Sequence, residues 1–144
     1  MSDREKATLD RLEGQISWYD KRSFYNQRSY KVLKLLSMIM IGLVPVLAGF
    51  GARAEIGGFF GFVALMCEGL QQLNQYHANW ISYRSTCEAL KHEKYLYLAR
   101  AGHYRDVSNP EPLLAEQVES LVSVEHAKWV STRRDANKKT QDTA

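Results

Sequence analysis

Residues 35–52 read LLSMIMIGLVPVLAGFGA, 18 residues without an ionisable side chain. A polar break, Arg53-Ala54-Glu55, follows, and residues 56–67 read IGGFFGFVALMC, again uncharged. A bilayer core of about 30 Å needs about 20 apolar helical residues. The first run meets this length with one flanking turn, and the second meets it over residues 54–73, which include Glu68. The two runs predict a helical hairpin through a membrane.

The alternative for this hairpin is the buried centre of a soluble helical bundle. A helix in a soluble core usually keeps a polar stripe that faces water, whereas Ser37 is the only classically polar side chain of the first run. The run also holds Pro45 and four small residues, Gly42, Ala48, Gly49 and Gly51; the proline and the glycines weaken soluble helices but are common in membranes. We therefore favour the membrane hairpin.

The composition of the whole chain excludes several classes of protein. Its 144 residues favour one domain, and its net charge of +3 is too small to indicate nucleic acid as a partner. Its 2 cysteines, Cys67 and Cys87, are too few for a secreted disulfide framework and are expected to be small buried hydrophobes. The first 34 residues are charged throughout, so no signal peptide is expected.

Positive charge flanks the two apolar runs on one side. The cations that flank the runs include Lys21, Arg22, Arg28, Lys31 and Lys34 before the first run, and Arg84, Lys91 and Lys94 after the second. Since cytoplasmic flanks carry the excess of Lys and Arg, both termini are expected in the cytoplasm, with Arg53 outside. The prediction is a multi-pass protein of the cell inner membrane, with the lipid bilayer as its first partner.

Helical periodicity continues on both sides of the hairpin. Leu9, Leu12, Ile16 and Tyr19 recur at helical spacing before it, and a second helical face runs to Ala101, with Gly102 as a plausible C-cap. A last helix carries Leu114, Val118, Leu121, Val122 and Trp129 on one face.

The predicted fold is therefore all-α. A two-span hairpin (35–73) is extended into cytoplasmic helices, with the C-terminal helix packing back on them. Residues 1–34 form an amphipathic helix that leads into the membrane, residues 74–132 a cytoplasmic helical region and residues 133–144 a polar tail.

Signals of catalysis are weak in this sequence. His92-Glu93 begins like a zinc-protease motif but lacks the second histidine, and no other histidine has ligand spacing with a cysteine. Phosphate-binding glycine loops and acyl-transfer motifs are absent from the sequence. We expect no enzyme activity, no metal and no cofactor.

One face of the second span is small and polar. Gly57, Gly61, Ala64 and Glu68 fall along it, and it continues through Gln72, Gln75 and Asn79. In one interpretation Glu68, Gln72, Gln75 and Asn79 line a narrow polar pathway between copies of the chain. In the other, Glu68 only reaches the inner headgroups, and Gly57, Gly61, Ala64 and Pro45 pack the hairpin together.

Downstream of the hairpin the sequence shows a family pattern: Trp80-x-x-x-Arg84, Glu88-x-Leu90-x-x-Glu93 and Gly102-x-Tyr104, with a late Glu125-x-x-x-Trp129. With Trp18-Tyr19 and Pro45 upstream, residues 15 to 130 resemble the bacterial two-transmembrane proteins called domain of unknown function 4231. These are similar to the SLATT group (SMODS and SLOG-associating two-TM effectors), membrane effectors of nucleotide-signalling conflict systems. The resemblance implies a two-span helical protein that oligomerises and forms a pore or perturbs membrane integrity.

Trp80, Arg84, Glu88 and Glu93 are accordingly candidates for cytoplasmic assembly or gating. The simpler interpretation of Arg84 and Glu88 is a surface ion pair worth about 0.3–0.5 kcal/mol. Two helices cannot enclose a pore, so conduction requires several copies. The expected function is a homo-oligomeric, ion-permeable channel or pore-forming effector, and the alternative is a non-conducting membrane anchor that recruits a cytoplasmic partner.

Overall fold

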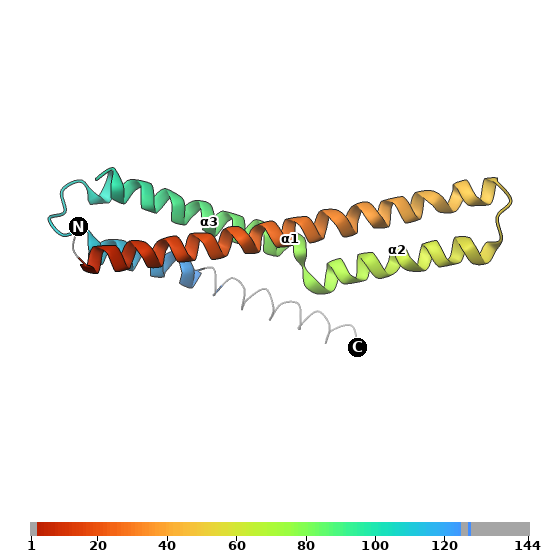
Figure 1. The fold of residues 1–144 in the computed structure, drawn as a ribbon, viewed down its shortest axis with the longest axis horizontal. Helices are drawn as coiled ribbons and strands as arrows, with labels where there is room; N and C mark the ends of the chain where they lie inside the picture. Colours follow the sequence, from red (N-terminus) through yellow and green to blue (C-terminus); the bar gives the residue numbers. More distant parts are fainter. Residues whose placement is uncertain (1–2, 125–126, 128–144) are drawn as a thin grey trace. The chain divides into compact units, whose positions relative to one another are not determined.

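The computed structural model describes residues 3–124 and 127. Its helices are α1 (Asp3–Gly49), α2 (Ala54–Asn74), α3 (Tyr76–Leu98), a short 3-10 helix (Gly102–Tyr104) and a C-terminal helix over residues 111–124 (Figure 1). No strand occurs within the described residues. The all-α prediction, with its hairpin of two long apolar helices, is confirmed.

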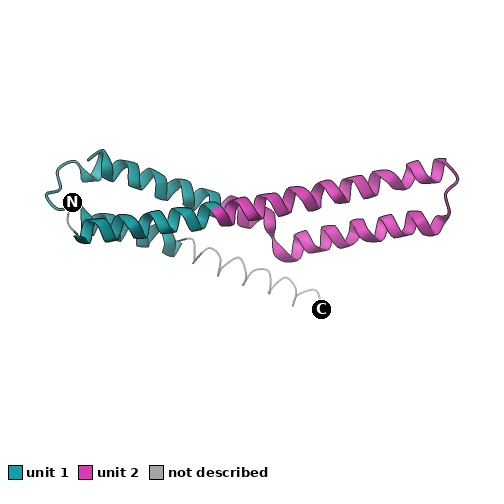
Figure 2. Cartoon of the chain, viewed as in Figure 1, with its two compact units in different colours: residues 1–20, 82–144 teal, residues 21–81 magenta. Residues whose placement is uncertain are grey.

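The chain divides into two compact units, and α1 contributes to both. Unit 2, residues 21–81, is the hairpin of α1 and α2, drawn in magenta in Figure 2. Its tight turn follows from Gly51, which takes a left-handed backbone with φ of 74°. The Gly51 N–H donates to Ala48 O at 3.1 Å and the Ala52 N–H to Leu47 O at 3.0 Å. These two bonds close the last turn of α1 as a Schellman motif.

A break separates α2 from α3, where the sequence predicts one continuous helical face. Gln75 adopts a left-handed conformation, with φ of 48° and ψ of 39°, and ends α2 at Asn74. The Asn79 side chain donates its Nδ2–H to Asn74 O at 2.9 Å and so satisfies a carbonyl that the break leaves free. The prediction of one continuous helix is therefore wrong at Gln75, where the Asn79 side chain caps the break.

Unit 1, residues 1–20 and 82–144, has its own hydrophobic core (teal in Figure 2). Three of its described helices each contribute a leucine with no exposed surface: Leu12 from α1, Leu90 from α3 and Leu114 from the C-terminal helix. Tyr19, Cys87, Tyr97, Tyr104 and Val118 complete the cluster. The C-terminal helix thus packs back as predicted. Trp129, the Glu125-x-x-x-Trp129 pattern and the 133–144 tail lie outside the described residues.

The end of α3 differs from the predicted Gly102 cap by two residues. Arg100 takes the left-handed position, with φ of 51°, and Ala101 N–H donates to Leu96 O at 3.0 Å. Gly102, also left-handed at φ of 58°, instead begins the 3-10 helix that places Tyr104 in the core.

Candidate functional site

A polar group joins the two apolar helices of unit 2. Glu68 of α2 accepts a hydrogen bond from Lys34 Nζ at 2.9 Å, and the Ser37 hydroxyl lies 2.8 Å from the same Oε1 atom. Ser37 is fully buried, and its Oγ also lies 3.0 Å from Lys34 O, so its single proton serves one acceptor at a time. Glu68 is thus neutralised within its own chain.

The other predicted pathway residues do not join Glu68 in one helical stripe. Gln72 is exposed on α2, Gln75 lies in the break and Asn79 is half-buried on α3, where its amide caps Asn74. The neighbouring Gln71 is the buried amide of this region, and its Nε2–H donates to Cys67 O at 3.3 Å. Polar side chains therefore lie on both sides of the break rather than along one continuous face.

The glycines Gly57 and Gly61 of α2 do not lie at a close contact between the two helices of the hairpin. Ala64 is buried at 2% exposure, but a Cβ added at Gly57 would meet only Val44, at an ordinary 3.9 Å, and one at Gly61 would meet nothing. Pro45 is exposed within α1. Neither Gly57 nor Gly61 is required for the approach of α1 and α2.

An aromatic group lies where α1 faces the beginning of α3. The His77 ring is 4.8 Å from that of Tyr30 and 5.8 Å from that of Trp80. Lys31 Nζ lies 6.0 Å from the centre of the Trp80 ring, at the outer limit of a cation–π contact. Trp80, predicted to act in assembly or gating, therefore belongs to this group in unit 2.

Arg84 and Glu88 form part of a charged network on the surface of unit 1. Arg84 Nη2 pairs with Glu88 at 2.7 Å, and Asp20 Oδ1 lies 3.6 Å from both Arg84 Nη1 and Lys91 Nζ. These side chains are about half exposed. Such pairs contribute little to stability, typically under about 1 kcal/mol each, because water screens them.

Glu93, grouped with Arg84 and Glu88 by the sequence, lies elsewhere. It is buried at 8% exposure, and its Oε1 accepts a hydrogen bond from Tyr104 Oη at 2.5 Å. His103 Nε2 lies 2.7 Å from the same oxygen. Burial, together with the hydrogen bond to Glu93, raises the pKa of Tyr104. Glu93 follows Arg84 by nine residues, which is two and a half turns of an α-helix, so the two side chains lie on opposite faces of α3.

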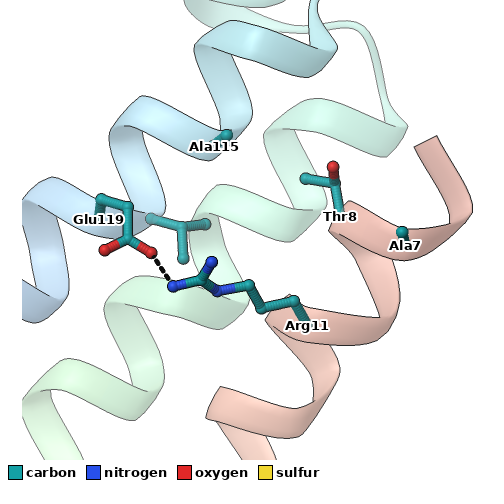
Figure 3. A pocket seen from close by; sticks show the side chains of 6 residues that line it. Ala7, Thr8, Arg11, Ala115 and Glu119 are labelled. Atoms are coloured by element: carbon teal, nitrogen blue, oxygen red, sulfur yellow. Dashed lines mark hydrogen bonds and ion pairs between the residues drawn. The ribbon is translucent and has the colours of Figure 1, made fainter. Parts of the chain in front are cut away.

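A shallow groove of about 270 Å³ separates the beginning of α1 from the C-terminal helix (Figure 3). Arg11 and Glu119 form an ion pair across it, and the other lining residues are small or apolar: Ala7, Thr8, Ala115 and Val118. Over the described part of the chain, no group of three or more His, Cys, Asp or Glu side chains could hold a metal ion. The Thr8 hydroxyl of this groove donates a hydrogen bond to Glu111 Oε1 at 3.4 Å.

A family model described as "Protein of unknown function (DUF4231)" matches residues 14–112. The chain belongs to this family. The DUF4231 match includes the hairpin, the Lys34–Ser37–Glu68 group and the Glu93–Tyr104 bond, so every predicted site residue lies within it. No curated protein and no solved structure matches the chain.

Proposed function

We propose that this protein crosses the bacterial inner membrane twice, with both termini in the cytoplasm, and assembles into a homo-oligomer that is permeable to ions. The lipid bilayer and further copies of the chain are its partners. The proposal has two separable parts, the membrane hairpin and the ion path, and they are supported by different features.

The observation that carries the membrane part is the exposure of the apolar helices. In the most apolar window of α1 only 6% of the residues are buried, and in that of the helices beginning at Ala54 only 17% are. The core helix of a soluble protein is mostly buried. Large apolar side chains such as Leu35, Phe59 and Leu65 are instead at least 60% exposed. Lipid is the solvent that suits such a surface.

Helix lengths support the same conclusion. The 21 residues of α2 extend about 31 Å, which matches the hydrocarbon core of a bilayer. On α1, the 20 residues that end at Gly49 extend about 30 Å and begin at Tyr30. The break at Gln75 and the Tyr30, His77 and Trp80 rings then fall at the inner interface, where aromatic residues are enriched.

The proposed depth of Lys34 and Glu68 in the membrane explains why their charges are paired. Lys34 and Glu68 then lie more than one turn inside the inner edge of the hydrocarbon, where a lone charge is unfavourable. Lys34 and Glu68 form an ion pair across the hairpin, and the Ser37 hydroxyl is hydrogen-bonded to the same Glu68 carboxylate. The cations before Lys34 and the sparse charge of the turn favour the orientation with Arg53 outside.

The ion path is proposed to form between copies, because two helices cannot enclose one. The open space at Gly61 supports a second copy packing there, since neither Gly61 nor Gly57 is needed inside the hairpin. Glu68 is the proposed charged residue of the path, with Gln72, Gln75 and Asn79 below it. The exposure of Gln72 and Gln75 supports this assignment.

The test is ion flux through liposomes that contain the purified full chain, combined with the mass of the solubilised complex. We expect a ring of four or more copies, and we expect Glu68→Gln to change the flux without changing that mass. Glu55→Gln is the matched control, because Glu55 is exposed at the opposite end of α2. A monomer, or equal flux in the Glu68 variant of a conducting protein, contradicts the path.

A second function is favoured by the pairing of Glu68 with Lys34, because a charge already neutralised within one chain does not need to face a pore. In this alternative the hairpin is a non-conducting anchor, and unit 1 recruits a cytoplasmic partner. It predicts no conductance at any assembly size, and capture of a partner that depends on the exposed face of residues 111–124.

A further inference from the structure

One straight row of side chains on α1 in unit 2 is basic and aromatic at its beginning and apolar farther along the helix. Lys21, Tyr25, Arg28, Val32, Leu35 and Ile39 recur at intervals of three and four residues, so they lie in one row on the helix. All of them are exposed, Tyr25 at 58% and Leu35 at 60%. The buried side chains Ser23, Asn26 and Ser37 lie on the opposite face of α1. The exposed row is apolar from Val32 onward and basic and aromatic before it.

No acidic residue counters this positive charge nearby in unit 2. The sequence has no Asp or Glu between Asp20 and Glu55, and none between Glu68 and Glu88. The only acidic side chains of unit 2 are therefore Glu55, in the first turn of α2, and Glu68, which is paired with Lys34. The polar side chains of the facing segment 71–79 are uncharged amides and His77. Arg28 and Lys31 thus present positive charge on an exposed surface next to the apolar helix.

The depth of these two cations follows from the placement of the hairpin. If the hydrocarbon begins at Tyr30, Lys31 lies at its edge, and Arg28 lies about 3 Å outside, at 1.5 Å per residue. The headgroup layer on each side of the core is about 5–8 Å thick. Both side chains are therefore long enough to extend into the headgroup layer, where the lipid phosphates lie, and Lys31 is within cation–π range of the Trp80 ring.

We propose that Arg28 and Lys31 form a binding site for the headgroup of anionic phospholipids in the inner leaflet, with Tyr25 beside it. Guanidinium and ammonium groups bind phosphate oxygens with charge-assisted hydrogen bonds, and the row of Leu35 and Ile39 lies along the acyl chains of the same lipid. A lipid fits better than a soluble phosphate compound because the basic row continues directly into the apolar one. This inference rests on the proposed membrane hairpin.

The test compares full-length proteins extracted in mild detergent from bilayers of equal parts phosphatidylglycerol and phosphatidylcholine. Native mass spectrometry measures which lipid each protein retains. Each cation near an anionic surface contributes about 1 kcal/mol, so Arg28→Gln with Lys31→Gln should lower the preference for phosphatidylglycerol about 30-fold. The matched control, Arg4→Gln with Lys6→Gln, removes the same charge from exposed positions of α1 in unit 1 and should retain the preference.

The outcomes separate this inference from the proposed function. Wild-type protein that is released from membranes by alkaline wash overturns the membrane hairpin, and the lipid site with it. Wild-type protein that resists the wash but retains both lipids equally overturns the lipid site alone. Equal loss in the control pair, or displacement of the lipid by millimolar inorganic phosphate, also overturns it. Loss confined to the Arg28 and Lys31 variant, itself still resistant to the wash, supports it.

Discussion

The hydrogen bond between Tyr104 and Glu93 should hold the core of unit 1 closed. Tyr104 has no exposed surface, and Glu93 is 8% exposed, so their 2.5 Å bond is shielded from water. Tyr104→Phe removes the donor and leaves the ring in place. A hydrogen bond to a charged group contributes about 1.5–3 kcal/mol, and His103 Nε2 remains 2.7 Å from the same oxygen as a second partner. We expect the variant to lose about 1.5–3 kcal/mol of stability in unit 1.

Cys87 provides the assay. Its side chain is fully buried in the same core, and burial raises the pKa of its thiol, so it reacts slowly in the folded protein. Labelling by a maleimide reports the fraction of molecules in which unit 1 is open. A loss of about 1.5–3 kcal/mol corresponds to labelling of Cys87 about 10- to 160-fold faster. Mass spectrometry of the Cys87 peptide separates it from Cys67 in α2.

The matched control is Tyr95→Phe, which deletes a tyrosine hydroxyl from a side chain that is 69% exposed on α3, the helix that carries Glu93. It should label at the wild-type rate. If Tyr104→Phe labels less than about threefold faster than wild type, the bond contributes less than about 0.7 kcal/mol, and the argument from burial is wrong. If both variants label equally fast, the effect belongs to tyrosine hydroxyls in general and not to Glu93.

Three further predictions concern stability. The pKa values of Tyr97 and Tyr104 are raised by burial and by hydrogen bonds to Glu5 and Glu93, so the folded state favours the neutral phenols. Thermal melts should therefore show full stabilisation of the protein below about pH 10 and a decline in stability above it. This decline should be shallower in Tyr104→Phe. Leu90→Ala should cost about 2–5 kcal/mol in thermal unfolding, whereas Leu98→Ala, at a position 60% exposed, should cost under about 0.5 kcal/mol. Gly51→Ala should lower the free energy of unfolding in detergent by about 1–2 kcal/mol, because Gly51 has a left-handed backbone. Gly49 is helical and has open space around it, so Gly49→Ala should be neutral or stabilising. Equal effects of the two substitutions would contradict the turn geometry.

The sequence predicts the hairpin well because uncharged runs of this length have few alternatives. It also contains a signal for the Lys34–Glu68 pair that composition alone does not reveal. Both residues lie 17 positions from Gly51, so an antiparallel hairpin that turns there brings them to the same level. The signal depends on the position of the turn, which the left-handed Gly51 decides.

The position of Glu93 and the break at Gln75 were harder to predict for different reasons. Glu93 follows Glu88 by five residues, about 140° around a helix, and this rotation turns it toward the core and away from the Arg84 and Glu88 pair. The break at Gln75 has no glycine or proline to mark it. It depends on the Asn79 side chain reaching back to Asn74 O, a contact between residues five apart that no propensity scale encodes.

The Gln75 break has a physical consequence for how the hairpin meets the interface. A helix that leaves the hydrocarbon without interruption carries its face straight into the cytoplasmic region, so any rotation of the span is transmitted. Here α2 ends after a length that matches the bilayer core, and a left-handed residue with one side-chain cap joins it to α3. Gln75→Gly relieves the backbone strain at this junction, and Gln75→Val increases it, since a β-branched residue disfavours positive φ. Both variants also remove the Gln75 amide from the proposed path, so a flux change of the same sign in both reports that loss. Flux changes of opposite sign, at unchanged oligomer mass, show that the junction couples the hairpin to α3.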